Sequence, residues 1–287
     1  MAASNSFKMK RKVKEMKFPI AIQVYSVRDF AKQDLYGTLK QLKEMGYDGV
    51  EFAGLYDHTP AEVRAMCEEL GLVPVSAHVP FKDMLGDPDG VIGMYKEIGC
   101  KYIAIPSMPG EIRAGTDGFG LGVEKIAELG REVERIGDIT LLYHNHDTEF
   151  LSVNGKYCLD VIYDTVPANL LQTELDTCWV NVGGENPAEY LLKYAGRSPV
   201  LHLKDFVGEK SENMYELIGE DTKKPTRPSN FALCPVGYGK QDFPSIIASA
   251  EKAGVQWLVV EQDNPTEQNN SLECAKLSRD YLRSIGY

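Results

Sequence analysis

Eight short β-rich runs alternate with longer helical patterns from residue 18 to the end of the chain. The runs, which we expect to be strands, are 20–25, 49–53, 73–78, 102–105, 139–144, 170–176, 200–204 and 257–261. The helical patterns lie near 33–45, 60–70, 87–98, 120–136, 155–165, 187–195, 242–253 and 269–284. Eight β-then-α units in 287 residues predict an α/β protein with a single (β/α)8 TIM barrel rather than an open doubly wound sheet. The first run is not followed by G-x-G-x-x-G, which argues against a dinucleotide-binding domain.

The barrel is expected to span residues 18–287 as one catalytic domain. Residues 1–17 are rich in lysine and arginine and lack an apolar segment, so we expect a flexible basic leader rather than a secretory signal. The segment 207–241 after the seventh strand is long for a connection in a barrel, which suggests a lid or a subunit contact.

Composition limits the partners of this chain. Lysine and arginine number 31 against 42 acidic residues, so the formal charge is −11 and a nucleic-acid or anionic-membrane partner is not expected. No run is long enough to span a membrane. The six cysteines form no C-x-x-C pair, which favours free thiols in a reducing compartment and a cytoplasmic protein. A homo-oligomer and a small partner subunit both remain open.

Alternation along the strands places polar residues on their inner rows. His202 and Lys204 share one row of the seventh run, and Glu174 and Asp176 share one row of the sixth. The other inner polar residues are Gln23, Tyr25, Glu51, Ser76, His78, Glu261 and Asp263. Barrels keep their active sites at the carboxyl ends of the strands, and buried charges need partners or a metal. Because Lys204 and Arg28 are too few to balance these acids, the pattern predicts a metal centre at this end.

Four residues at successive strand ends are the predicted metal ligands. Glu149 lies just past the fifth strand, and Asp176, His202 and Glu261 lie on the sixth, seventh and eighth. A site of three carboxylates and one imidazole is typical of one divalent ion such as Mn²⁺, with Co²⁺ or Mg²⁺ as alternatives.

Six segments resemble the sugar phosphate isomerase/epimerase family, which has the xylose isomerase-like TIM barrel. They are YDGVEFAG (47–54), SAHVPF (76–81), YHNHDTEF (143–150), LDTCW (175–179), LHLKD (201–205) and VVEQD (259–263). The resemblance covers residues 18–286 and implies that the same four ligands bind one Mn²⁺-like ion. Relatives with the YHNH-x-x-EF pattern include keto-sugar epimerases, dehydratases and C-glycoside deglycosidase catalytic subunits. Trp179 and Cys178 stand where many relatives carry a further histidine, which argues against a second metal and against the endonuclease branch.

The expected chemistry is proton removal beside a carbonyl through an enediolate. By resemblance to ketose epimerases, Glu149 and Glu261 would remove and return the proton. His144 and His146 are a further candidate base or acid, or they orient Glu149. The residues expected to contact a small carbohydrate are His78, Lys204, Glu51, Tyr25 and Trp179.

Two reactions fit this set. The first is isomerisation or epimerisation of a sugar or keto sugar, and the alternative is β-elimination from a keto sugar or a 3-keto glycoside. A nuclease would need a basic face, and a non-catalytic sugar-binding barrel would not need the inward carboxylates beside H-x-H. Whether the substrate is phosphorylated stays open, since segment 207–241 contains no convincing phosphate cradle.

Overall fold

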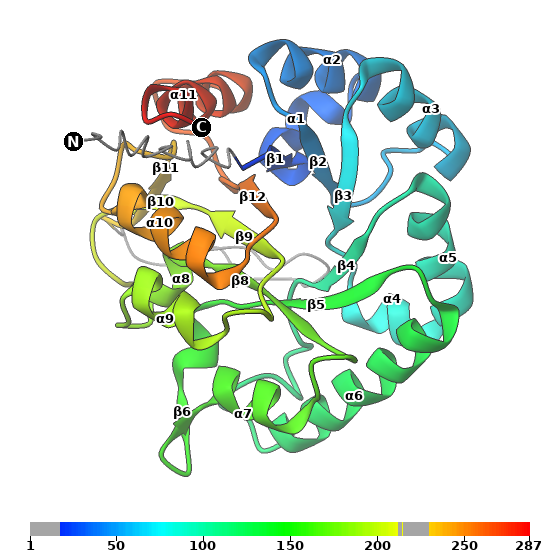
Figure 1. Ribbon diagram of the computed structural model, residues 1–287, viewed down its shortest axis with the longest axis vertical. Helices are drawn as coiled ribbons and strands as arrows, with labels where there is room; N and C mark the ends of the chain where they lie inside the picture. The colour runs from blue at the N-terminus through cyan, green and yellow to red at the C-terminus, as the bar shows by residue number, and fades with distance from the viewer. Residues whose placement is uncertain (1–17, 212–213, 215–229) are drawn as a thin grey trace, which may run out of the picture.

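Eight parallel strands form a nearly closed barrel with helices around it (Figure 1). The structure is a computed structural model that describes residues 18–211, 214 and 230–287. The predicted (β/α)8 barrel is therefore confirmed, whereas the predicted leader 1–17 lies outside the described residues. In spatial order the strands are β3 (Val73–Ala77), β2 (Gly49–Phe52), β1 (Ile20–Gln23), β12 (Trp257–Val260), β9 (Val200–Leu203), β8 (Gln172–Asp176), β5 (Thr140–His144) and β4 (Tyr102–Ile105).

The barrel closes between β3 and β4 through a short contact. An isolated parallel bridge joins His78 to Ala104, and Val79 N donates to Ala104 O at 3.1 Å. The bridge lies at the carboxyl end of β3, so closure brings His78 to the same mouth as the polar ends of the other strands.

Eight helices follow the strands near the predicted positions. They are α2 (Leu35–Met45), α3 (Pro60–Leu70), α5 (Pro88–Ile98), α6 (Phe119–Ile136), α7 (Cys158–Thr165), α9 (Pro187–Lys193), α10 (Phe243–Ala253) and α11 (Ser271–Ser284). The described residues also form five shorter helical segments that were not predicted: η1 (Val24–Val27), α1 (Arg28–Ala31), α4 (Phe81–Gly86), η2 (Asp147–Phe150) and α8 (Thr177–Val182). Four of them, η1, α4, η2 and α8, immediately follow or lie close to the carboxyl end of a barrel strand and so shape the mouth.

Local sequence signals determine where the longer helices begin and end. Thr59 and Glu62 form a reciprocal capping box at the start of α3, with Pro60 in its first turn. Gly46 ends α2 with φ of +94°, a left-handed conformation that costs glycine little.

A two-stranded ribbon stands at the base of segment 207–241. β10 (Asp205–Val207) pairs antiparallel with β11 (Ala232–Cys234). The carboxylate of Asp205 accepts backbone N–H bonds from Phe206, Gly237, Gly239 and Gln241 at 2.8–3.1 Å. The chain after the ribbon is therefore tied to the end of β9 through one buried side chain. A second ribbon pairs β6 (Ser152–Val153) with β7 (Lys156–Tyr157), so α7 begins at Cys158, three residues after the predicted start.

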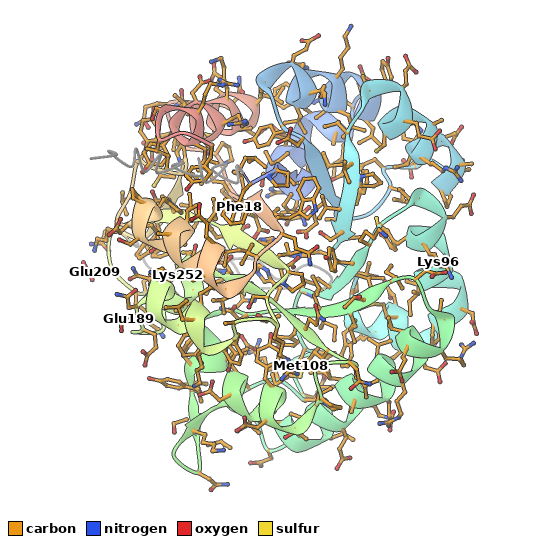
Figure 2. The ribbon with its side chains drawn as sticks, viewed as in Figure 1. Phe18, Lys96, Met108, Glu189, Glu209 and Lys252 are labelled. Atoms are coloured by element: carbon orange, nitrogen blue, oxygen red, sulfur yellow. The ribbon has the colours of Figure 1, made fainter. Side chains whose placement is uncertain are left out.

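In the described part of the chain, buried apolar side chains form three clusters. One of them lies around α8 and the β10–β11 ribbon and consists of Cys178, Trp179, Phe206, Phe231 and Leu233. A large cluster fills the space between strands and helices, and it includes Leu175, Leu201 and Leu258. A small cluster fills the amino-terminal half of the barrel interior, and its buried members are Ala21, Val75, Ala104, Leu142, Val200 and Val259. Figure 2 shows charged side chains such as Lys96 and Glu189 at the periphery. The small cluster forms an apolar plug, which leaves only the carboxyl-terminal half of the interior for polar groups. The predicted strand faces are therefore confirmed.

The six cysteines are free and buried, as expected from the sequence. Among the described residues, none of the helices has the length and apolar character needed to cross a membrane.

Candidate active site and metal centre

Strand register brings the inner polar residues together at one end of the barrel. Asp176 on β8 pairs with His202 on β9, which pairs with Val259 on β12, two residues before Glu261. Because parallel strands end at the same edge, these three side chains converge above the apolar plug. All three are at least 96% buried.

A buried network of ion pairs joins these three residues to Lys204. His202 Nδ1 lies 2.9 Å from Glu261 Oε2. Lys204 Nζ lies 2.8 Å from Glu261 Oε2 and 3.2 Å from both Asp176 Oδ2 and Asp263 Oδ1. Burial alone would lower the pKa of Lys204, but the carboxylates of Asp263, Glu261 and Asp176 raise it well above its usual value. One ammonium thus faces three carboxylates at this mouth.

Four of the five histidines of the chain gather here. His144 and His202 lie edge to face with ring centroids 4.7 Å apart, and His78 stacks on His202 at 5.2 Å. His146 follows β5 and lies 5.2 Å from His144. The remaining histidine, His58, is a partly exposed residue near Glu62 at the start of α3. The fold brings these four histidines together, since they come from the ends of three separate strands.

The histidines at the mouth differ in charge. Burial lowers the pKa of His144 to about 4 and the pKa of His146 well below its usual value. Burial would also lower the pKa of His202, but Glu51 and Glu174 raise it well above its usual value. His144 and His146 are therefore neutral at physiological pH, whereas His202 is charged when no metal is bound.

The structure does not place Glu149 with Asp176, His202 and Glu261, as the sequence had predicted. It lies in η2, where its carboxylate accepts hydrogen bonds from Tyr143 Oη at 3.0 Å, His146 N at 2.8 Å and Thr148 Oγ1 at 3.2 Å. The carboxylate caps the helix that carries it, so its oxygens are already engaged. The fifth strand instead directs the imidazole of His144 toward the other three residues: its Nε2 lies 3.6 Å from Asp176 Oδ2 and 4.0 Å from Glu261 Oε2.

The predicted substrate-binding residues fall into two sets. Tyr25, His78 and Lys204 line one cavity at the mouth together with Pro106, His144, His146, Glu261 and Asp263. Glu51 is completely buried, and its carboxylate accepts from Gln23 Nε2 at 2.7 Å and from Ser76 Oγ. Trp179 is also buried, with its ring 5.7 Å from that of His146 and 5.2 Å from Lys204 Nζ. Glu51 and Trp179 therefore support the residues around the cavity rather than line it.

Two further acids, Glu174 and Asp263, belong to the site, although the sequence motifs predicted no role for them. Glu174 lies one pleat below Asp176, and His78 Nε2 is 2.6 Å from its Oε2. Asp263 lies beside Lys204 and lines the cavity. Both stand on the predicted inner rows, at spacing i, i+2 from Asp176 and Glu261, and this spacing was the available signal.

Within residues 18–211, 214 and 230–287, two groups of buried side chains could hold a metal ion. The carboxylate-rich group is His144, Asp176, His202 and Glu261, and the histidine-rich group is His78, His144, Glu174 and His202. In each group the candidate ligand atoms all lie within 4.8 Å of one another. Asp176 Oδ1 caps α8 through Cys178 N at 2.8 Å, whereas Asp176 Oδ2 faces the mouth, 3.2 Å from Lys204 Nζ and 3.6 Å from His144 Nε2. A buried carboxylate oxygen that faces imidazoles and further carboxylates fits a divalent ion.

The model of the xylose isomerase-like TIM barrel family matches residues 39–285. The chain belongs to this family. A sugar phosphate isomerase/epimerase from Parabacteroides distasonis is 21% identical, with a TM-score of 0.73 over 95% of this chain and 96% of that one. The IOLI protein, solved with a bound zinc atom, gives a TM-score of 0.67 at 18% identity over 94% of this chain and 99% of that one. These structures share the fold of the present barrel.

Six sequence relatives are named inosose dehydratase, among them one from Clostridium botulinum and one from Geobacillus kaustophilus. The one from Clostridium botulinum is 29% identical over 168 residues, which cover 56% of this chain and 52% of the relative. The match thus spans about half the length of that relative. The one from Geobacillus kaustophilus is 24% identical over 272 residues, which cover 85% of each chain. The relatives of this chain therefore include sugar-modifying enzymes.

Proposed function

We propose that the protein is a divalent-metal-dependent lyase that eliminates water from a keto sugar or keto polyol. The observation that carries this proposal is the pairing of the carboxylate-rich group with the neutral imidazole of His146 in one cavity. The inosose dehydratases that resemble this chain support elimination, and the Geobacillus relative does so over most of the length. Sequence motifs alone favoured epimerisation, for which a second carboxylate, Glu149, was needed at the metal.

The residues proposed to hold the ion are His144, Asp176, His202 and Glu261. Here His144 takes the place first assigned to Glu149, because the Glu149 carboxylate is engaged by η2 and Tyr143. A bound divalent ion would supply Lewis acidity that makes the C–H beside a chelated carbonyl more acidic. Mn²⁺ remains our expectation for this ion, with Co²⁺ or Mg²⁺ as alternatives, although a second imidazole makes the site less oxygen-rich than predicted.

His146 is the proposed general base and general acid. Its neutral ring accepts the proton from the carbon beside the carbonyl. The buried imidazolium then donates that proton to the hydroxyl on the next carbon. The C–O bond breaks, the C=C bond forms, and the proton leaves in the water molecule. The depressed pKa of His146 suits the second step, since burial disfavours the charged ring and makes it a strong acid.

Lys204 and Asp263 are proposed to bind substrate hydroxyls. An ammonium and a carboxylate 3.2 Å apart can donate to one oxygen and accept from its neighbour, which suits the vicinal diols of a sugar. Both groups line the cavity beside Tyr25. The preferred substrate is accordingly a small polyhydroxylated ketone. The six buried thiols agree with our expectation of a reducing compartment such as the cytoplasm.

Epimerisation or isomerisation is the second candidate. Glu261 and His146 both line the cavity, so two groups able to exchange protons face the same space. If one removes the proton and the other returns it on the opposite face, a stereocentre is inverted without loss of water.

Turnover in deuterated water separates the two reactions. The Mn²⁺-loaded protein is incubated with inososes, ketohexoses and 3-keto glycosides, and the products are followed by NMR. We expect loss of water from an inosose or a related ketone. Deuterium at a retained, inverted carbon would replace this proposal by epimerisation, and release of an aglycone would replace it by deglycosylation. Absence of both exchange and elimination in a metal-loaded protein would overturn both candidates.

His146→Asn tests the base directly. We expect it to lower kcat by about 10²–10⁴-fold, the usual contribution of a general acid–base group. The matched control is His58→Asn, which removes the histidine outside the site and should leave kcat unchanged. Normal turnover by His146→Asn would assign the proton transfer to another residue.

A further inference from the structure

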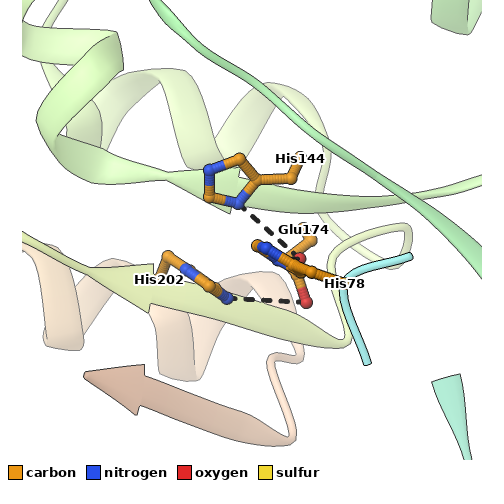
Figure 3. Close-up of side chains that lie close together, drawn as sticks. All are labelled: His78, His144, Glu174 and His202. Carbon is orange, nitrogen blue, oxygen red and sulfur yellow. Dashed lines mark hydrogen bonds and ion pairs between the residues drawn. The ribbon is translucent and has the colours of Figure 1, made fainter. Parts of the chain in front are cut away.

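A second group of ligands lies deeper in the barrel than the carboxylate-rich group. It is the histidine-rich group defined above, in which His78 follows β3, His144 ends β5, Glu174 lies on β8 and His202 on β9. Figure 3 shows the three imidazoles arranged around the carboxylate of Glu174. Since Asp176 and Glu174 are two residues apart on the same strand face, the two groups occupy successive levels of one interior.

The distances within the histidine-rich group are close to those of a coordination sphere. Glu174 Oε2 lies 2.6 Å from His78 Nε2 and 3.6 Å from His144 Nδ1, and Glu174 Oε1 lies 3.6 Å from His202 Nε2. Two ligands of a tetrahedral zinc ion at ~2.0–2.1 Å are about 3.3 Å apart. Two of the three spacings therefore need to shorten slightly, and the third needs to lengthen by less than 1 Å.

Two ligand atoms of this group have no hydrogen-bond partner in the described part of the chain. They are Glu174 Oε1 and His144 Nδ1, and both residues are at least 98% buried. Buried polar atoms without partners are uncommon in folded proteins, and an unseen ion is one of their ordinary causes. The His144 nitrogen in this group is Nδ1, whereas His144 Nε2 faces Asp176 in the carboxylate-rich group.

The donor set determines which ion fits. Three imidazoles and one carboxylate form a nitrogen-rich site that suits Zn²⁺, whereas the carboxylate-rich group offers two imidazoles and two carboxylates. In the metal-free protein Glu51 Oε1 lies 3.1 Å from His78 Nε2 and 3.0 Å from His202 Nε2, so an ion that binds these nitrogens displaces both contacts with Glu51. Gln23 and Ser76 hold the Glu51 carboxylate beside the site. Nearby imidazoles lower the pKa of Glu174, so this carboxylate supplies a negative charge for a divalent ion.

We propose that His78, His144, Glu174 and His202 form a zinc site that competes with the carboxylate-rich group for metal. The two groups use opposite nitrogens of His144 and His202. A neutral imidazole has only one nitrogen lone pair to offer, so the chain binds one ion at a time. An ion in the histidine-rich group removes two of the four ligands from the carboxylate-rich group, and Zn²⁺ therefore displaces the ion at the upper level. The inference concerns metal binding and does not depend on the proposed reaction.

X-ray absorption on the unmodified protein provides the first test. The metal-free full chain is loaded with one equivalent of Zn²⁺ or of Mn²⁺, without substrate. At the zinc edge we expect scattering from three imidazoles, and at the manganese edge from two. Metal analysis after loading with both ions should give a total of one ion per chain. Two imidazoles at the zinc edge, or two ions per chain, would overturn the proposal.

Paired substitutions provide the second test, with isothermal titration as the readout. His78→Asn removes a ligand of the histidine-rich group only, so we expect Zn²⁺ affinity to fall at least tenfold and Mn²⁺ affinity to change less than threefold. Asp176→Asn removes a ligand of the carboxylate-rich group only and should show the opposite pattern. Equal losses for both metals in both variants would contradict two separate sites. If His78→Asn does not fold, Glu174→Gln, which keeps the shape of the side chain, takes its place.

Discussion

Lys204 Nζ lies 2.8 Å from Glu261 Oε2, and both side chains are buried at the mouth of the barrel. The same ammonium is 3.2 Å from Asp176 and from Asp263, so a single lysine balances three carboxylates where a divalent ion is proposed to bind. Lys204 and the ion would thus neutralise the same carboxylates. This relationship leads to the first prediction.

Lys204→Met should destabilise the metal-free protein strongly. Breaking a buried charge pair by removing one partner costs about 3–5 kcal/mol, because the remaining charges stay buried without compensation. Added Mn²⁺ should restore part of this loss, so the increase in melting temperature on metal addition should be larger in the variant than in the wild type. Thermal unfolding with and without Mn²⁺ measures both quantities. The control is Lys156→Met, which removes an exposed partner of Asp164 and should unfold near the wild-type temperature. If Mn²⁺ raised the melting temperature equally in Lys204→Met and in the wild type, Lys204 and the ion would not neutralise the same carboxylates.

Metal binding should release protons and strengthen as pH rises. His202 carries a raised pKa in the metal-free protein, yet an imidazole binds metal through a deprotonated nitrogen. Near neutral pH we therefore expect the apparent affinity for Mn²⁺ to rise by up to about tenfold per pH unit for each proton released. Titration calorimetry in buffers of different ionisation enthalpy counts these protons.

The same shifts predict how the stability of the metal-free protein depends on pH. The raised pKa of His202 contributes stability that is complete below the unfolded-state pKa of about 6.5 and is lost as pH rises through the folded-state value. The lowered pKa of His144, about 4, works in the opposite sense: its contribution is present above pH ~6.5 and is lost as pH falls toward 4. Imidazole NMR should accordingly find His202 protonated and His144 neutral at pH 7. A neutral His202 in the metal-free state would remove the basis for the expected proton release.

Glu149→Gln distinguishes a ligand from a capping residue. The Glu149 carboxylate accepts from Tyr143, Thr148 and the backbone of His146, and a glutamine carbonyl can keep part of this pattern. We expect Mn²⁺ affinity within about threefold of the wild type, whereas Glu261→Gln should reduce it at least tenfold. A comparable loss in both variants would return Glu149 to the ligand set.

The two tryptophans allow metal binding to be followed at one defined place. The Trp179 ring lies 5.2 Å from Lys204 Nζ, whereas Trp257 begins β12 at the opposite end of the barrel. In Trp257→Phe we expect a saturable change in fluorescence on Mn²⁺ addition, because the ion alters the charges beside Trp179. In Trp179→Phe the remaining Trp257 should not respond. A response from Trp257 alone would place the ion away from this mouth.

The eight strands and the faces of their side chains were predictable from local sequence. Alternation in LHLKD placed His202 and Lys204 on one row, and in LDTCW it placed Leu175 and Asp176 on opposite rows. Glycine and proline signals, as at Gly46 and Pro60, located helix boundaries to within a few residues. These features depend on the conformational preferences of neighbouring residues, which is information that a sequence carries directly.

The position of Glu149 depended on the tertiary structure. Its spacing from His146 is equally consistent with a ligand and with a cap, and only the placement of Tyr143 and η2 engages its oxygens. The roles of His78 and Glu174 also depended on the tertiary structure. These two residues lie 96 positions apart in the sequence, yet His78 Nε2 is 2.6 Å from Glu174 Oε2. The sequence by itself determined which side chains enter the barrel. Only the closure and register of the strands decided which of them meet, because contacts between distant strands depend on how the whole sheet closes.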